Sequence, residues 1–249
     1  MNLVQKLPIG FGFVCMLMLS SCSKEDVQTP QPQITGVNQS SNLRGGSWID
    51  VLPQMPSTTG TLGLGVYAPG WRKIYDQLPA GPQLLPSGTS NFKYLWGNLN
   101  SPWKKPLPPI AGVPSTASFL TIGAIPTNDQ WSNAAIGEAK LRHLKPGKKY
   151  VITCYVASSI ASESEAYPRV IMMQVSKCIS DIMPKGDCIL NGSGAILVEE
   201  QGVWSKQEIY FDATNAEMAV YFRAFASNLD GKTGYFNVFV DNNSIKQLN

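Results

Sequence analysis

The last 45 residues of the chain alternate between apolar and polar side chains in three segments separated by turns. The segments are residues 206–212, 218–226 and 235–241. In the first, Ile209 and Phe211 share one face, while Glu208, Tyr210 and Asp212 share the other. A period of two between Asn, Asp and Gly turns predicts half-buried antiparallel strands. Because a sheet with one apolar face needs a second layer, the chain is predicted to be an all-β protein, a two-layer antiparallel β-sandwich.

The third segment shows the same alternation. One face carries Phe236, Val238 and Val240, and the other carries Tyr235, Asn237, Phe239 and Asp241. Further strands are predicted at residues 62–67, 91–96, 117–125, 134–141, 150–156, 169–175 and 194–199. Residues 145–148, Lys-Pro-Gly-Lys, predict a β-turn.

The N-terminus predicts a secretory signal. Lys6 precedes an apolar run over residues 7–19, and small residues lead up to Cys22. The run is too short to span a bilayer comfortably as a permanent helix. Leu-Ser-Ser-Cys at 19–22 resembles the bacterial lipoprotein signal, which implies a diacylglycerol on Cys22, cleavage before it and acylation of the new N-terminus. Ordinary secretion by signal peptidase is the alternative.

The residues after Cys22 give a further expectation about location. Ser-Lys-Glu-Asp at 23–26 resembles the tag that some Gram-negative bacteria use to send lipoproteins to the outer face of the outer membrane. A solvated charged linker is the alternative. Residues 27–42 are polar and Pro-rich, which predicts a flexible tether. The predicted organisation is therefore a signal peptide at 1–21, a lipidated Cys and linker at 22–42, and one β-sandwich domain at 43–249.

Charge excludes two classes of partner. Removing residues 1–21 takes away one Lys, which leaves 19 basic residues against 17 acidic ones. A near-neutral balance argues against nucleic acid or anionic lipid headgroups as partners. Only 15% of residues are charged, with 22 Gly and 18 Pro, as suits a β-rich extracellular protein with many turns.

Four motifs in the second half resemble one family. Residues 144–152, Leu-Lys-Pro-Gly-Lys-Lys-Tyr-Val-Ile, are similar to a hairpin of the galactose-binding-like jelly rolls, the fold of many carbohydrate-binding modules. Trp204 opens a later strand as in that family, and residues 211–214 match its Phe-x-Ala-Thr turn. Residues 238–245 match its closing strand. The resemblance covers residues 134–249 and implies a jelly-roll sandwich that binds carbohydrate.

The same family often carries a structural calcium ion between an N-terminal strand and the last strand. The resemblance implies Asp241 as one ligand, with Asp50 as an N-terminal partner, because hard oxygen ligands suit Ca²⁺. A surface Asp at a strand end is the alternative for each. Asn243 stands where the family has an apolar residue, so the closing strand is expected to fray or bulge there.

Aromatic residues in loops suggest where a sugar would bind. Residues 43–133 are rich in Pro and Gly and hold five of the six tryptophans. A pyranose presents an apolar C–H face that stacks on an aromatic ring, while amide and charged groups contact its hydroxyls. The predicted ligand-binding residues are Trp71, Trp96, Trp103, Trp131 and Tyr167. The alternative is that these rings pack as lids over the ends of the sandwich.

The residues give little support for catalysis. His143 is the only histidine, which excludes a zinc site built from His ligands, and no G-x-S-x-G nucleophile elbow is present. We expect His143 to be a solvated turn residue. Paired carboxylates could cleave glycosides without His, but most of those present fall in loops or at strand ends. They are Glu138, Glu163, Glu165, Asp181, Glu199, Glu200 and Asp212.

Three cysteines, Cys154, Cys178 and Cys188, remain in the exported domain after Cys15 leaves with the signal and Cys22 takes lipid. A Cys178–Cys188 disulfide would close a short loop and stabilise the fold by ~2–3 kcal/mol. Cys154 lies in a predicted strand and would then be a buried free thiol. Pairing of Cys154 with either of the others is the competing arrangement.

Three functions remain open. The first is a surface-anchored, non-catalytic lipoprotein that binds a glycan through loop aromatics, with calcium as its only candidate cofactor. The second is a structural or protein-interaction lipoprotein of the envelope, in which the same aromatics are packed. The third is a glycan-cleaving enzyme.

Overall fold

The computed structural model describes residues 51–73, 86–124, 136–177, 190–225 and 231–249, all within one compact unit, Ile49–Asn249. The predicted boundaries after residues 21 and 42 lie outside these ranges. In the part of the chain that is described, no helix is long and apolar enough to cross a membrane.

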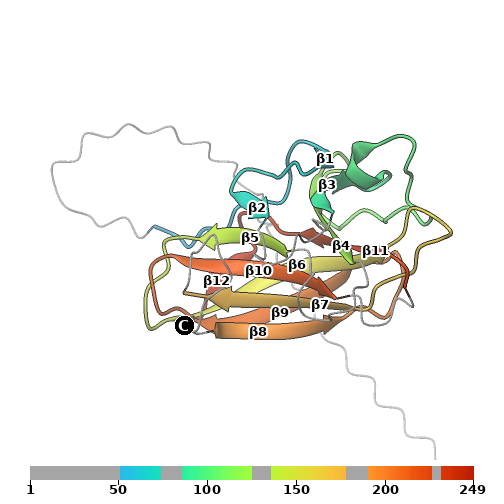
Figure 1. The fold of residues 1–249 in the computed structure, drawn as a ribbon. Helices are drawn as coiled ribbons and strands as arrows, with labels where there is room; N and C mark the ends of the chain where they lie inside the picture. Colours follow the sequence, from blue (N-terminus) through green and yellow to red (C-terminus); the bar gives the residue numbers. More distant parts are fainter. Residues whose placement is uncertain (1–50, 74–85, 125–135, 178–189, 226–230) are drawn as a thin grey trace, which may run out of the picture. The chain divides into compact units, whose positions relative to one another are not determined.

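The described residues form two antiparallel sheets, which confirms the predicted all-β sandwich (Figure 1). The first sheet has the order β1-β3-β4-β11-β6-β12, with β9 also paired to β6. Its strands are β1 (Gly63–Leu64), β3 (Ser87–Asn91), β4 (Ser118–Ala124), β6 (Lys149–Ser159), β9 (Ser205–Asp212), β11 (Gly234–Phe239) and β12 (Ile245–Gln247). The second sheet has the order β2-β5-β10-β7-β8. Its strands are β2 (Trp71–Lys73), β5 (Ile136–Leu141), β7 (Val170–Ser176), β8 (Leu190–Leu197) and β10 (Met218–Phe225).

The main core lies between the two sheets. Ile209 and Phe211 of β9 are buried there, while Glu208, Tyr210 and Asp212 are exposed, as the alternation predicts. The five-stranded sheet contributes the alternate residues of β7 and β10 to the same core. They are Ile171, Met173, Val175, Met218, Val220, Phe222 and Ala224. Burial of this apolar area drives the two sheets together.

The outer face of the seven-stranded sheet is covered by a second apolar cluster, which we call the aromatic layer. Tyr235 and Phe239 of β11 are buried in it, so β11 is enclosed on both faces. The chain between β3 and β4, which includes the short 3₁₀ helix η1 (Leu95–Gly97), supplies much of the cover. The buried members are Phe92, Leu95, Trp103, Leu107, Ile110, Ala117, Phe119, Ala157, Tyr235 and Phe239, with Trp96, Val113, Tyr155, Ala161 and Trp204 packed against them.

The prediction of a strand at residues 91–96 is wrong. The Asn91 side chain accepts hydrogen bonds from the backbone N–H groups of Lys93 (2.9 Å) and Tyr94 (2.8 Å), which turns the chain at the end of β3. Trp96 then adopts a positive φ of 55°, and its N–H donates to Ser90 Oγ at 2.9 Å. The Asn91 side chain therefore takes backbone N–H groups that a continued strand would need, and this overrides the strand propensity of Tyr94 and Trp96.

The closing motif is also two elements rather than one strand. After β11, Asp241 Oδ1 accepts from the Asn243 N–H (2.8 Å), and the Asp241 N–H donates to Ser244 Oγ (2.9 Å). The chain then re-enters the sheet as β12, against β6. The expected irregularity at Asn243 is thus a turn. The predicted Lys145–Lys148 turn is confirmed, with the Lys148 N–H donating to the Lys145 carbonyl and Gly147 at φ 81°.

Candidate functional site

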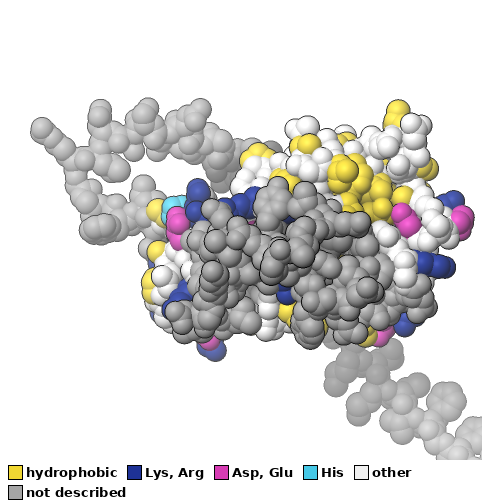
Figure 2. Space-filling model, viewed as in Figure 1, with side chains coloured by type: hydrophobic (Ala, Val, Ile, Leu, Met, Phe, Trp, Pro, Cys, Tyr) yellow, Lys and Arg dark blue, Asp and Glu magenta, His cyan; other side chains and the backbone are white. Residues whose placement is uncertain are grey.

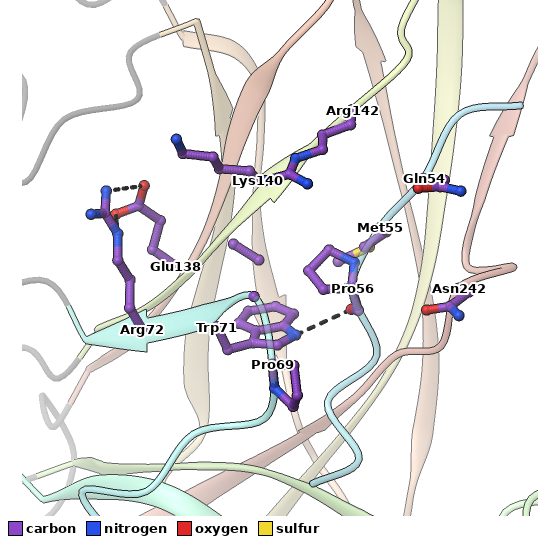
Figure 3. A pocket seen from close by; sticks show the side chains of 12 residues that line it. Gln54, Met55, Pro56, Pro69, Trp71, Arg72, Glu138, Lys140, Arg142 and Asn242 are labelled. Atoms are coloured by element: carbon purple, nitrogen blue, oxygen red, sulfur yellow. Dashed lines mark hydrogen bonds and ion pairs between the residues drawn. The ribbon is translucent and has the colours of Figure 1, made fainter. Parts of the chain in front are cut away.

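A pocket of about 560 Å³ opens at the β2–β5 edge of the five-stranded sheet (Figure 3). Three parts of the chain that are far apart in sequence meet there. They are residues 54–56, residues 69–72 and the end of β5, and Asn242 beyond β11 completes the wall. The volume lies within the range of about 300–1,000 Å³ typical of pockets that hold a small molecule.

Backbone hydrogen bonds hold the N-terminal wall of the pocket in place. The N–H of Gln54 donates to the Arg142 carbonyl (2.9 Å), and the N–H of Arg142 donates back to the Gln54 carbonyl (3.0 Å). Thr58 is fully buried and is joined by three hydrogen bonds to the backbone of Val240. Met55 between them is buried in the main core. The wall is therefore anchored to both sheets, and the side chain of Gln54 projects from a fixed backbone.

The indole of Trp71 forms part of the pocket floor. Because Trp71 pairs with Ala139 in the β2–β5 ladder, its side chain faces the main core, where its ring centroid lies 6.0 Å from that of Phe222. Its Nε1–H donates to the Pro56 carbonyl at 3.1 Å. Only 6% of Trp71 is exposed. The ring therefore supports the pocket and offers a ligand an edge rather than a stacking face.

An ion pair flanks this floor. Arg72 lies opposite Glu138 in the β2–β5 register, and both residues point away from the main core. The guanidinium donates to both carboxylate oxygens, from Nε at 3.1 Å and from Nη2 at 2.9 Å. Glu138 is fully buried, while the Arg72 side chain is 40% exposed. The pair fixes the orientation of the guanidinium, and Arg72 lines the pocket with part of its side chain exposed.

Polar and cationic side chains form the rest of the wall. Figure 3 shows the Arg72–Glu138 pair on one side of the indole and Gln54 and Asn242 on the other, with Lys140 and Arg142 along β5 and its end. Gln54, Arg142 and Asn242 are exposed. An amide offers both donors and an acceptor, so this wall can contact hydroxyl groups from several directions.

A second pocket of about 660 Å³ lies beside the first. Gln54 and Asn242 line both pockets. The other lining residues include Leu52, His143, Lys145 and Lys246. His143 is exposed, as expected for a solvated turn residue, and has a positive φ of 58°.

The four predicted ligand-binding aromatics that lie in the described ranges do not all line one pocket. Trp71 lines the first pocket, whereas Trp103 is 2% exposed within the aromatic layer and donates its indole N–H to the Asn91 carbonyl at 2.8 Å. Trp103 therefore has no open ring face for a sugar. Trp96 is half-buried with its ring perpendicular to Tyr235, and Tyr167 is half-buried too. Trp131 lies outside the described residues.

Five residues that line the first pocket were not predicted from the sequence as site residues: Gln54, Arg72, Lys140, Arg142 and Asn242. Arg72 and Glu138 stand 66 positions apart, so no local spacing links them. The one sequence signal was the closing motif, which contains Asn242. It marked the end of a strand but not the pocket beside it.

Four of the seven carboxylates considered for catalysis have a charged or hydrogen-bonding partner among the described residues. Glu138 is bound by Arg72, Glu163 lies 2.8 Å from Lys104, and Asp212 lies 3.8 Å from Lys149. Glu165 accepts hydrogen bonds from the Ala161 and Ser162 N–H groups and from the Tyr235 hydroxyl. Glu199 and Glu200 are exposed, and Asp181 lies outside the described residues.

Calcium has one described candidate ligand, Asp241, whose Oδ1 is already engaged by the Asn243 N–H. Asp50 lies outside the described residues. In the described ranges, no three His, Cys, Asp or Glu side chains come together as a metal-binding group. The calcium site stays a prediction, because Asp241 is the one of its two predicted ligands that the structure describes.

Cys154 is a free thiol, fully buried in the main core, as the first cysteine arrangement predicts. Burial raises the pKa of this thiol to about 12, so it stays protonated and acts as a small apolar side chain. Cys178 and Cys188 lie outside the described residues, and their disulfide stays a prediction.

Comparison with known proteins places the chain in no family, because no family model and no curated protein matches it. Solved structures match at low similarity. The K2 cleaved adhesin domain of Lys-gingipain gives a TM-score of 0.41 at 12% identity, over 79% of this chain and 98% of that one. TmCBM61, a structure in complex with β-1,4-galactotriose, gives 0.34 at 11%, over 74% of this chain and 90% of that one.

The CBM22-1–GH10 modules of the Clostridium thermocellum xylanase 10B, in complex with xylohexaose, give a TM-score of 0.37 at 10% identity. That match covers 80% of this chain but only 30% of the other. Carbohydrate-binding modules are thus among the structures that this chain resembles. At these scores the likeness concerns the β-sandwich fold alone.

Proposed function

We propose that the protein is a lipid-anchored, non-catalytic carbohydrate-binding protein, and that its ligand occupies the pocket beside Trp71. The observation that carries this proposal is the convergence of Gln54, Arg72, Arg142 and Asn242 on one open pocket. Amide and guanidinium groups held on a fixed backbone suit a polyhydroxylated ligand, because each hydroxyl can both donate and accept. This assignment keeps Trp71 beside the ligand and does not use Trp96, Trp103 or Tyr167.

The binding mode follows from the exposure of the site. The pocket offers hydrogen-bonding side chains beside apolar groups, among them Pro56, Pro69 and the edge of Trp71. Hydrogen bonds exchanged with water contribute only about 0.5–1.5 kcal/mol each, so a single site is expected to bind weakly. Many copies held on one surface would raise the effective affinity through avidity.

Anchoring is the second part of the proposal. Cys22 would carry the lipid, and two or three acyl chains hold a protein on a membrane far more durably than one. The acidic residues 25–26 behind it support export to the cell exterior. Metabolic labelling with palmitate tests the anchor. Label should enter the wild type and not Cys22→Ala, and protease treatment of whole cells should remove the domain.

Binding is tested by titrating the full-length protein, purified in detergent, with a panel of neutral and acidic polysaccharides. The proposal expects at least one ligand, with affinity lost in Gln54→Ala/Asn242→Ala while the melting temperature stays within about 2 °C. Both side chains are exposed and the Gln54 backbone bonds do not depend on its side chain, so the fold is expected to tolerate the change. No binding to any glycan, or unchanged binding by the double variant, would contradict the assignment.

A protein-interaction role is supported by a different observation. Leu62, Leu64, Val66 and Leu99 are all exposed, at 36% to 73% of their surface. Figure 2 shows hydrophobic side chains gathered over the region of β1, β3 and η1. Exposed apolar groups close together mark protein contact sites. Cross-linking through a cysteine placed at Leu64 would capture an envelope protein on this alternative and none on the glycan proposal.

A further inference from the structure

The two pockets described above form one surface, which we call the cationic groove. They share the lining residues Gln54 and Asn242, so the two pockets adjoin at these exposed side chains. Each has the volume of a small-molecule pocket, and together they offer room for an oligosaccharide of more than one ring. The groove follows the end of β5 and continues past Asn242 to β12.

Positive charge is concentrated along this groove. The first pocket is lined by Arg72, Lys140 and Arg142. The second is lined by Lys145 and Lys246. Among the described lining residues of both, Glu138 is the one carboxylate, and its two oxygens already accept from Arg72. The groove is therefore cationic in a protein whose overall charge is close to neutral.

One nearby carboxylate outside the groove does not offset this charge. Arg142 Nε lies 3.8 Å from Glu217 Oε1, and both side chains are more than half exposed. An exposed pair at this distance is weak, because water and salt screen it. Arg142 therefore keeps most of its capacity to bind another anion.

Backbone geometry explains how successive residues come to line the groove. Leu141 and Leu144 are buried in the main core, while Arg142 and His143 between them are exposed. A strand would send neighbouring side chains to opposite faces. At φ 58°, His143 takes a left-handed conformation uncommon for a residue with a side chain, and this ends the alternation of β5. Arg142 thus lines the first pocket and His143 the second.

From these observations we infer that the ligand is an acidic oligosaccharide, one that carries carboxylate or sulfate groups on its sugar rings. This inference rests on the proposed function and names the class of its ligand. Guanidinium groups bind carboxylates and sulfates through paired hydrogen bonds. Between the cations, Gln54 and Asn242 are placed for the neutral hydroxyls. Alternating charge and amide groups match a chain of sugars in which acid groups recur.

The test compares ligands that differ only in charge. Polygalacturonate and its fully methyl-esterified form share one backbone, and chondroitin sulfate adds sulfate esters. Binding to the full-length protein in detergent is measured by titration. We expect an acidic polymer to bind at least about tenfold more tightly than its uncharged counterpart, and the difference to shrink as salt rises from about 50 to 500 mM.

Matched variants locate the effect. Lys140→Ala/Arg142→Ala is expected to weaken binding of the acidic ligand by about tenfold or more, and to weaken binding of the uncharged ligand by a smaller factor. Lys93→Ala/Lys148→Ala removes two exposed lysines that do not line the groove and should change neither.

Each contrary result has a distinct meaning. Equal binding of the charged and esterified polymers would overturn this inference and leave the proposed function standing. No binding to any polysaccharide would overturn both. Double-stranded DNA bound as tightly as the acidic polysaccharide would show a site for polyanions in general, and would overturn the assignment to sugars.

Discussion

The aromatic layer and the cationic groove each contain a buried tryptophan, but the surroundings of the two rings differ. In the aromatic layer the ring centroids of Trp103 and Tyr235 lie 5.9 Å apart, and the indole N–H of Trp103 donates to the Asn91 carbonyl. In the groove the indole of Trp71 lies under a wall of amides and cations. A tryptophan in a loop therefore does not by itself indicate a sugar site. The polar groups around the ring decide its role.

Trp103→Ala should give the largest change and separates the two regions most clearly. The side chain is 2% exposed, so its removal leaves a cavity in the aromatic layer, at a cost of about 3–5 kcal/mol in the free energy of unfolding. Chemical denaturation measures this cost. Glycan affinity, measured where the variant is still folded, should stay close to that of the wild type. Normal stability with lost affinity would instead make Trp103 a binding residue.

Alkaline pH should weaken the main core through Cys154. Because burial raises the pKa of this thiol from about 9 in the unfolded chain to about 12, the folded state holds the proton more tightly. Stability is therefore full below pH 9 and falls as the pH rises toward 12, by a few kcal/mol at most. Urea midpoints at pH 8 and pH 11 measure the fall.

The fall should be shallower in Cys154→Ala, which has no thiol to ionise. Burial also raises the pKa of Tyr235, so Tyr235→Phe provides the corresponding control in the aromatic layer, above pH 10. An alkaline loss that is identical in the wild type and in both variants would rule out these two groups as its source.

Arg72→Ala should lower stability less than the two changes above, and it should weaken glycan binding in the groove. It removes two charge-assisted hydrogen bonds to a buried carboxylate, for which we expect a loss of about 1–3 kcal/mol. Arg72→Lys keeps the charge but not the forked geometry, so its stability should lie between that of the wild type and that of Arg72→Ala. If Arg72→Ala proves as stable as the wild type in thermal denaturation, the pair contributes nothing to holding β2 on β5.

Tyr210→Ala should change least. Tyr210 is 60% exposed on the outer face of β9, where its hydroxyl donates to Glu208 at 2.9 Å. We expect a change within about 0.5 kcal/mol in stability and none in glycan affinity. A large loss of affinity would move the site from the groove to the outer face of β9.

Much of the sandwich follows from period-two alternation, and the aromatic layer shows where that argument ends. Ile209 and Phe211 of β9 face inward as predicted. On β11 the two faces were separated correctly, but the side with Tyr235, Asn237 and Phe239 is buried as well. Its cover comes from residues 92–117, more than 100 positions away, and no local pattern carries that information.

The buried polar residues of β11 explain why its second face looks mixed in the sequence. Asn237 is fully buried, accepts from the Thr121 hydroxyl at 2.7 Å and donates to Ser159 Oγ at 2.8 Å. A hydrogen-bonded polar group can be buried at little cost. An exposed strand face and a covered one with such a network therefore produce the same alternation.

The groove could not be predicted from the sequence, because its residues also come together through contacts between distant segments. Gln54, Arg72, Arg142 and Asn242 come from four separate segments, and each is an ordinary polar residue in its own surroundings. The β2–β5 pairing, the hydrogen bonds between Gln54 and Arg142 and those between Thr58 and Val240 bring these segments together. The family resemblance correctly implied a sandwich, whereas the aromatic residues proposed for the ligand came from a separate argument about ring stacking.

The location of the bound glycan tests the central claim most directly. A crystal structure of the protein with the polysaccharide fragment that binds best should show sugar rings in the groove, with hydrogen bonds to Gln54, Arg142 and Asn242. Sugar stacked on Trp96 or on another ring of the aromatic layer, with the groove empty, would contradict the account.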